Sequence, residues 1–271
     1  MKKSLRQMMA FFFREMDMRK RNWMWQAVWI VYDLMWAMSV GFLGLGVSAV
    51  TNTQVDTGTY VLYLLVGSFM WTYLSSVFGI VSWAVTWERW EGTIEYTFMA
   101  PVHRTLHLIG NSIFAIIYGL FRMVIVFFIS SFVFDFSLTN ANFIGAGIIL
   151  VFASVSFIGL GMIAAVLPLI SPEMGDKTTL IMEAIIMMIS GIFYPISTLP
   201  QWMQHIANLS PGTYALEGMR QALNQGVSVS GLWPYIWPLI IIGFVLIPLG
   251  NYIFMLGERY VKKSGKLKRD G

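Results

Sequence analysis

Cysteine is absent from the 271-residue sequence. This absence excludes disulfide bonds, thiol catalysis and cysteine-ligated metal sites, and it leaves the redox compartment undecided. Charged residues are scarce at 12%, whereas 57% of the residues are hydrophobic and the mean hydropathy is +0.67. Such a chain is too apolar for a soluble domain and too long for a single membrane anchor. We therefore expect an all-α membrane protein that forms one domain over residues 1–271.

Motifs for nucleotide binding and catalysis are missing as well. The sequence has no G-x-x-x-x-G-K-[ST] loop, so we do not expect this chain to bind ATP in the P-loop manner. Its three histidines, His103, His107 and His205, are scattered and form no H-E-x-x-H zinc motif. No histidine lies deep in an apolar run, which disfavours an intramembrane serine protease. We expect no catalytic residue, cofactor or metal in this chain.

Apolar runs predict six membrane spans, because a helix needs roughly 20 apolar residues to cross a bilayer. They cover residues 23–50, 60–86, 108–134, 143–170, 180–194 and 232–256. Residues 1–22 precede them and repeat apolar side chains at helical spacing, at Leu5, Met8, Met9, Phe12, Phe13 and Met16. This pattern is typical of a helix that lies along the membrane interface. A simple basic anchor on anionic lipid is the alternative.

Lysine and arginine gather on one side of this six-span arrangement, which predicts that both termini are cytoplasmic. That side would hold the N-terminal helix, the loop at 86–107, Lys177 and the basic tail at 257–271, and the opposite side would hold Arg220. Because the positive residues lie at span ends, the net charge of +4 indicates contact with membrane lipid rather than nucleic acid. We expect a multi-pass protein of the cell (inner) membrane.

The stretch TWERWEGTIEYTFMAPVHRTLH at 86–107 is a polar island between two apolar runs. Apolar residues recur in it at helical spacing, at Trp87, Trp90, Ile94 and Phe98. An adjoining stripe contains Glu88, Glu91 and Glu95, and the residues that point away from the apolar side are Arg89, Thr93 and Tyr96. Pro101 would stop the helix. The pattern predicts one amphipathic helix whose charged flank faces water, and a solvated cap between two spans is the open alternative.

Three ionisable residues lie inside the expected spans, where a charge is costly. Asp33 is about three turns into the first span, and Arg122 is near the middle of the third. They are expected to pair across adjacent helices, and the alternative is that one of them lines a polar path for a substrate. Glu183 is close enough to the cytoplasmic end of the fifth span to reach the interface.

The segment at 195–226, before the last span, is broken by prolines and glycines. Pro200 suits a first helical turn, Ser210, Pro211 and Gly212 interrupt the chain, and Thr213 is a candidate cap for the next helix. Two short helices on the outer side are the plain expectation. An ordinary packed loop is the alternative.

Two ordered motifs resemble the ABC type-2 exporter permeases. The string EGTIEYTFMAPVHR is similar to the first cytoplasmic loop of that family, and the second motif comprises Ser190, Gly191, Phe193, Tyr194, Pro195, Leu199, Pro200, Trp202, Pro211, Tyr214 and Arg220. The resemblance implies that the loop at 86–107 is a coupling helix that docks on a separate ATPase. Its coupling residues would be Glu88, Arg89, Glu91, Gly92, Thr93 and Glu95. The second motif would form a re-entrant hairpin over the outer end of the translocation path.

This resemblance implies an exporter subunit whose power comes from partners. Two ATPase subunits would bind ATP and Mg, and a second copy of this chain or a related permease would complete the transporter. The apolar, methionine-rich and aromatic-rich spans favour a lipophilic or amphipathic substrate, such as a drug, an antibiotic or a lipid-linked molecule. A secondary transporter or channel, which would act without an ATPase, and an intramembrane enzyme are the alternatives.

Overall fold

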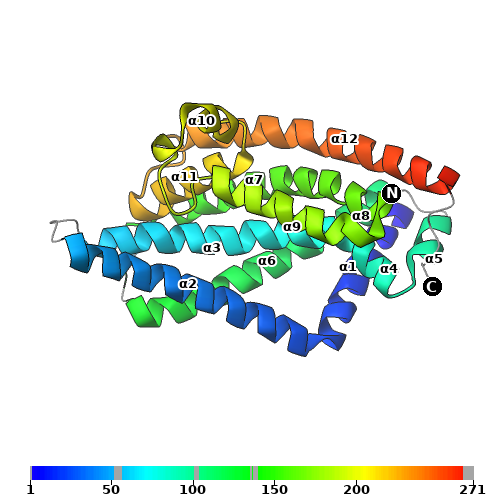
Figure 1. Cartoon of the computed structure of the whole chain (residues 1–271), viewed down its shortest axis with the longest axis horizontal. Helices are drawn as coiled ribbons and strands as arrows, with labels where there is room; N and C mark the ends of the chain where they lie inside the picture. Colours follow the sequence, from blue (N-terminus) through cyan, green and yellow to red (C-terminus); the bar gives the residue numbers. More distant parts are fainter. Residues whose placement is uncertain (1, 52–56, 101–103, 135, 137–139, 265–271) are drawn as a thin grey trace.

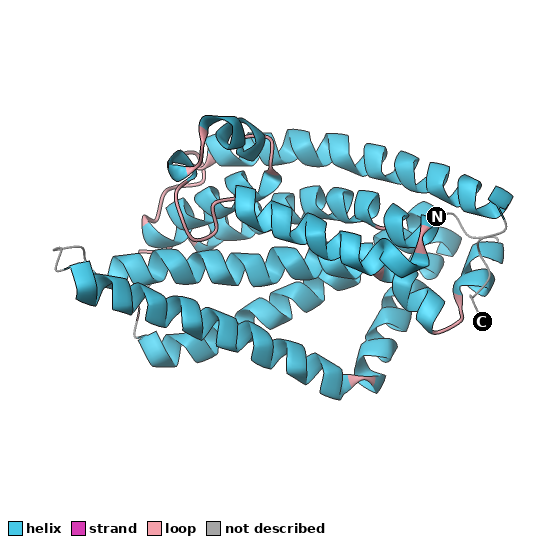
Figure 2. Cartoon of the chain, viewed as in Figure 1, coloured by secondary structure: helices cyan, strands magenta, loops and turns pink. Residues whose placement is uncertain are grey.

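The computed structural model describes residues 2–51, 57–100, 104–134, 136 and 140–264. Within these ranges every regular element is a helix (Figures 1 and 2). The elements are α1 (Lys2–Arg21), α2 (Trp23–Thr51), α3 (Thr57–Ser82), α4 (Ala84–Trp90), α5 (Ile94–Met99), α6 (Arg104–Phe134), α7 (Phe143–Ala164), α8 (Val166–Ile170), α9 (Pro172–Ile189), η1 (Ile196–Thr198), α10 (Gln201–Ala207), α11 (Pro211–Asn224) and α12 (Trp233–Ser264). The expected all-α class is confirmed for this part of the chain.

Five segments of the described chain are long and apolar enough to cross a membrane. They are Trp23–Val47, Gly58–Ser82, Thr105–Phe134, Phe143–Ile170 and Trp233–Ser264. The span expected at 180–194 corresponds to α9, whose apolar part, Thr179–Ile189, is shorter than these five. The chain turns at 190–194 instead of continuing as a helix.

The α3 helix forms the centre of the bundle. Of the most apolar window in α3, 83% is buried, against 22% for α2, so α3 is surrounded by protein while much of α2 faces outward. Its core side chains, including Tyr73, Leu74 and Phe78, are fully buried. We expect the exposed apolar faces of the outer helices to contact lipid or other chains.

Glycines allow α7 and α12 to pack closely. Gly243, Gly250 and Gly257 recur every seventh residue on α12, and an added Cβ at each would lie within 3.0 Å of an atom of α7 or α8. At Gly250 the nearest atom is the backbone oxygen of Gly159, at 2.8 Å. Small residues at such crossings let helix backbones approach in membrane proteins.

The short helices occupy opposite ends of the bundle. Figure 1 shows α10 and α11 at one end of the long helices, and α1, α4, α5 and the last turn of α12 at the other. The α4–α5 segment and the α10–α11 segment therefore lie far apart. Pro101 and His103 belong to the coupling motif but lie outside the described residues, as does the basic tail beyond Ser264.

Candidate functional site

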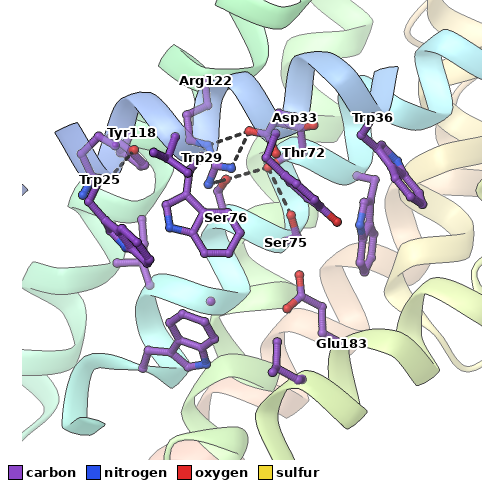
Figure 3. A pocket seen from close by; sticks show the side chains of 18 of the residues that line it. Trp25, Trp29, Asp33, Trp36, Thr72, Ser75, Ser76, Tyr118, Arg122 and Glu183 are labelled. Atoms are coloured by element: carbon purple, nitrogen blue, oxygen red, sulfur yellow. Dashed lines mark hydrogen bonds and ion pairs between the residues drawn. The ribbon is translucent and has the colours of Figure 1, made fainter. Parts of the chain in front are cut away.

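A cavity of about 610 Å³ lies between α2, α3, α6 and α9. Six tryptophans line it. Trp25, Trp29 and Trp36 come from α2 (Figure 3), Trp71 from α3, Trp83 from the N-cap of α4 and Trp87 from α4 itself. The cavity is open along α2, because the lining residues Trp25, Val28 and Tyr32 are exposed. Its volume is in the range of small-molecule pockets, roughly 300–1,000 Å³.

The expected contact between Asp33 and Arg122 is present in the wall of this cavity. Arg122 Nε donates to Asp33 Oδ2 at 2.8 Å, and Arg122 Nη2 donates to the same oxygen. Arg122 Nη1 donates to Ser76 Oγ at 2.9 Å (Figure 3). The pair therefore joins α2, α3 and α6, and all three guanidinium nitrogens are occupied.

Glu183 lines the same cavity from α9, opposite the pair. Figure 3 shows its carboxylate directed toward the wall that carries Ser75. Within the described part of the chain this carboxylate forms no ion pair and no hydrogen bond. The three ionisable residues expected inside spans are thus brought to one site.

A second cation, Arg19, closes the α1 end of the cavity. Its guanidinium lies over the ring of Tyr118, 5.4 Å from the centroid, and donates to Gln26 Oε1 at 3.3 Å. Tyr118 also donates to Gln26 Oε1, at 2.7 Å. Glu15, which is buried one turn earlier on α1, interacts with the Arg19 charge, and burial raises the pKa of Glu15.

Glu88 is buried, which corrects the expectation that its carboxylate faces water. Its side chain is 2% exposed, with Arg14 Nη1 at 2.7 Å and His107 Nε2 at 3.1 Å from Oε1. Burial by itself would raise the pKa of Glu88, but the contacts with His107 and Arg14 outweigh it and hold the pKa below its usual range. Glu88 therefore ties α4 to α1 and α6 within the chain.

Arg89 is also buried instead of exposed. Its Nη2 donates to the carbonyl oxygen of Leu169 at 2.8 Å. Leu169 lies in the last turn of α8, where carbonyls have no partner within the helix. Arg89 thus caps α8 and fixes α4 against it.

The expected single amphipathic helix is two helices. Gly92 has φ +70° and divides α4 from α5. The N–H of Gly92 bonds to the carbonyl of Arg89 at 3.0 Å, and the N–H of Thr93 bonds to that of Glu88 at 2.9 Å. This pair of bonds is a Schellman motif, which favours glycine at the left-handed position.

The exposed surface of the α4–α5 segment differs from the expected charged stripe. Trp90, which was expected on the apolar side, is exposed, as are Glu95, Tyr96 and Met99. Glu91 is partly exposed and forms an ion pair with Arg21 at the end of α1. We call Trp90, Glu91, Glu95, Tyr96 and Met99 the end surface.

At the opposite end, Arg220 holds the turn after α9. It donates to the carbonyls of Gly191 at 3.0 Å and Ile192 at 2.5 Å, and its guanidinium lies 3.6 Å from the ring centroid of Tyr63. The two hydrogen bonds and the contact with the Tyr63 ring offset the cost of burying the Arg220 charge.

The other residues of the second motif are spread over the turns and short helices. Pro195 and Pro200 precede η1 and α10, and Pro211 starts α11. Tyr194 donates to the carbonyl of Met188, Tyr214 donates to that of Asn208 at 2.8 Å, and Trp202 is exposed. Thr213 was the wrong choice of cap, because Ser210 occupies that position and Pro211 is the first helical residue.

Most of the residues that build these sites were not expected from the sequence to do so. Arg14, Glu15 and Arg19 were regarded as parts of an interfacial helix, and His107 was considered only as a metal ligand. Trp25, Trp29 and Trp36 fall at positions i, i+4 and i+11, which share a helix face, and this spacing was the available signal for the cavity.

The described chain is helical and has five segments long and apolar enough to cross a membrane, which is the architecture of a multi-pass membrane protein. The model of the family described as ABC-2 type transporter matches residues 6–224, so the chain belongs to that family. It is also 23% identical, over 163 residues, to proteins named "Probable multidrug ABC transporter permease YbhR" from Escherichia coli strain K12 and from Escherichia coli O157:H7. These matches cover 60% of this chain and 44% of the length of each relative. The chain spans less than half the length of these relatives, and family membership identifies it as a membrane component of the ABC-2 transporter type.

Proposed function

We propose that this chain is the transmembrane subunit of an ATP-driven exporter of lipophilic or amphipathic molecules. The observation that supports this substrate class is the cavity of about 610 Å³, which is lined by six tryptophans and by the three ionisable residues Asp33, Arg122 and Glu183. Drugs, antibiotics and lipid-linked molecules fit such a lining, because aromatic walls offer large apolar contact area. A relative named as a multidrug permease supports the same class.

The proposed topology has six spans, with α9 as the fifth. The apolar part of α9, Thr179–Ile189, is about 16 Å long, so the turn at 190–194 would have to complete the crossing of the hydrocarbon core. Both termini and the end surface would then lie in the cytoplasm, and α10 and α11 would form the outer hairpin, with Tyr194, Pro195, Pro200, Trp202, Pro211, Tyr214 and Arg220 shaping it. We infer that α1 lies along the cytoplasmic interface.

The end surface is the proposed docking site for the ATPase. It combines exposed aromatic and methionine side chains with two carboxylates, and such mixed surfaces are typical of protein interfaces. Four other coupling residues would not touch the ATPase but would hold the docking site in position. Their contacts fix α4 and the turn to α5; they are Glu88, Arg89, Gly92 and Thr93. Movement of the docked ATPase would reach the cavity through α4, because Trp87 on this helix and Trp83 at its N-cap line the cavity.

Two ATPase copies and a second permease, identical or related, would complete the transporter. The exposed apolar face of α2 beside the open cavity suits a contact with that second permease. ATP would drive the spans between two states only through contacts that differ between those states. ATP and Mg would bind to the partner subunits.

Co-expression with the ABC ATPase encoded nearest to this chain tests the proposal. The two proteins should co-purify, and Glu95→Lys should reduce ATPase recovery and ATP-driven export while detergent stability stays normal. Glu95 is preferable to Glu91, whose reversal would also break the ion pair with Arg21. Gln201→Lys, which is exposed at the opposite end, is the matched control and should recover the ATPase normally.

Three results would contradict the proposal. Normal ATPase recovery with Glu95→Lys and Tyr96→Ala would mean that the end surface is a solvated cap. Transport by this chain without an ATPase would favour a secondary transporter or channel. Turnover of a substrate without transport would favour an intramembrane enzyme.

A further inference from the structure

We propose that the cavity binds an organic cation, with Glu183 as its counter-charge and the tryptophan wall as its apolar contact. This inference names the substrate class of the proposed exporter and therefore rests on that function.

Glu183 is the carboxylate in the cavity wall that has no ion pair among the described residues. Arg122 and Asp33 neutralise each other through two hydrogen bonds to one carboxylate oxygen. Arg19 interacts with the charge of Glu15, which is buried one turn earlier on α1 and also forms an ion pair with Arg14. The Glu183 carboxylate, by contrast, lines the cavity with no ion pair or hydrogen bond within the described chain.

Arg122 is poorly placed to bind an anion. All three nitrogens of Arg122 donate to Asp33 or Ser76. Arg19 donates to Gln26, and its guanidinium lies over the ring of Tyr118. An anionic ligand would have to displace the contacts of Arg122 or bind at the Nε of Arg19, which has no hydrogen-bond partner, and it would also meet the carboxylate of Glu183.

The walls favour a cation that has a large apolar surface. Tryptophan is the best of the aromatic side chains for cation–π contact, and six tryptophans surround this cavity. A ligand held by aromatic faces does not need to donate many hydrogen bonds, so bulky quaternary ions are suitable. Glu183 lies across the cavity from the side of α3 that carries Ser75, and a cation between them would face both a carboxylate and aromatic rings (Figure 3).

The binding test uses tetraphenylphosphonium and tetraphenylborate, which have nearly the same size and shape and opposite charges. The purified chain in lipid nanodiscs, without an ATPase, is dialysed against each radiolabelled ion, and binding to empty nanodiscs is subtracted. We expect the phosphonium to bind at least about tenfold more tightly than the borate. Equal binding of the two ions, or tighter binding of the borate, would overturn the inference.

Variants then assign the preference to Glu183. Glu183→Gln should weaken phosphonium binding about tenfold and leave borate binding unchanged or improved, whereas Glu183→Asp should retain the preference for the cation. Glu217→Gln is the matched control, because that carboxylate accepts a hydrogen bond from Gln221 on α11 and does not line the cavity. Unchanged phosphonium binding in folded Glu183→Gln would overturn the role of Glu183. If that variant does not fold, the comparison of the two ions on the wild-type chain still decides the ligand class.

The proposed function fails in a different way. A chain without cation preference that still captures the ATPase and exports a neutral molecule would overturn this inference alone. A chain that never captures the ATPase would overturn the exporter while the measured ion preference remained valid.

Discussion

Asp33 and Arg122 meet inside the bundle, where removing one charge is more damaging than removing both. Their side chains are 9% and 12% exposed, so neither is well hydrated. A buried pair contributes little net stability relative to an apolar replacement, but a buried charge without its partner costs about 3–5 kcal/mol. The energetic effect of the pair is therefore measured by removing one partner at a time, and the number of its hydrogen bonds does not predict it.

Asp33→Ala and Arg122→Ala should each lower expression and thermal stability in detergent, and the double variant should be milder than the sum of the two. Double-mutant coupling of about 1 kcal/mol or more is expected for residues in contact. Asp17→Ala, an exposed carboxylate on α1, is the control and should combine additively with Arg122→Ala. Strict additivity of Asp33→Ala with Arg122→Ala would rule out the contact.

The Glu88 carboxylate should stabilise the fold in a pH-dependent manner. Its pKa in the folded chain is lower than its usual value of about 4.3, so the folded state favours the ionised form. The contribution is then present above the unfolded pKa and is lost as pH falls through the folded pKa. Glu88→Gln should lower the melting temperature at pH 7, and the difference from wild type should shrink below about pH 4.

Melting curves of both proteins across pH 3–8 measure this effect. Glu95→Gln is the matched control, because Glu95 is exposed, and it should change the melting temperature little at any pH. If the melting temperatures of wild type and Glu88→Gln differed by the same amount at every pH, Glu88 would stabilise the fold through its packing and not through its charge.

At the scale of elements, the glycine stripe of α12 sets the distance to α7. A Cβ at Gly250 would lie 2.8 Å from the backbone oxygen of Gly159 and 2.9 Å from the Cβ of Met162. Neither atom belongs to the end of a flexible side chain, so the helices must separate. Gly147 on α7 differs, because no atom lies within 4 Å of its added Cβ.

These two glycines provide a matched pair of substitutions. Alanine favours a helix over glycine by up to about 1 kcal/mol, so Gly147→Ala should be neutral or stabilising. Gly250→Ala should be destabilising by about 1–3 kcal/mol, because overpacking outweighs the gain in helix propensity. Thermal unfolding in detergent measures both, and equal effects would mean that α7 and α12 are not closely packed.

At the scale of the whole molecule, the proposed topology puts the two groups of short helices on opposite sides of the membrane. Single cysteines can report this directly, because the chain has none of its own. Leu209→Cys, at a position 77% exposed beside α10, should react with an impermeant thiol reagent in whole cells. Tyr96→Cys, at a position 80% exposed on α5, should react only after permeabilisation. Labelling of Tyr96→Cys in intact cells would mean that the orientation is opposite to the proposed one. The cysteine-free chain serves as the control for non-specific labelling.

Several features were open to prediction because they depend on local sequence alone. The hydrophobic runs at 23–50, 60–86, 108–134, 143–170 and 232–256 correspond to long helices, since a continuous apolar segment has few other stable forms in a membrane. Asp33 and Arg122 were foreseen as partners because a lone buried charge is costly. The breaks at Pro200 and at 210–212 were visible because proline and glycine act on the backbone itself.

What the sequence determined by itself is thus the class of the protein, its long helices and the segments where the helices are interrupted. Only the tertiary structure decided which charges are buried. The periodicity of a helix shows on which face of that helix a side chain lies, but it does not show which other helix packs against that face. Glu88 and Arg89 belong to a polar stretch, yet Arg14, His107 and the end of α8 enclose them, whereas Trp90 remains exposed. The cavity has the same origin, because its walls come from helices that are distant in the chain and become neighbours only when the bundle packs around α3.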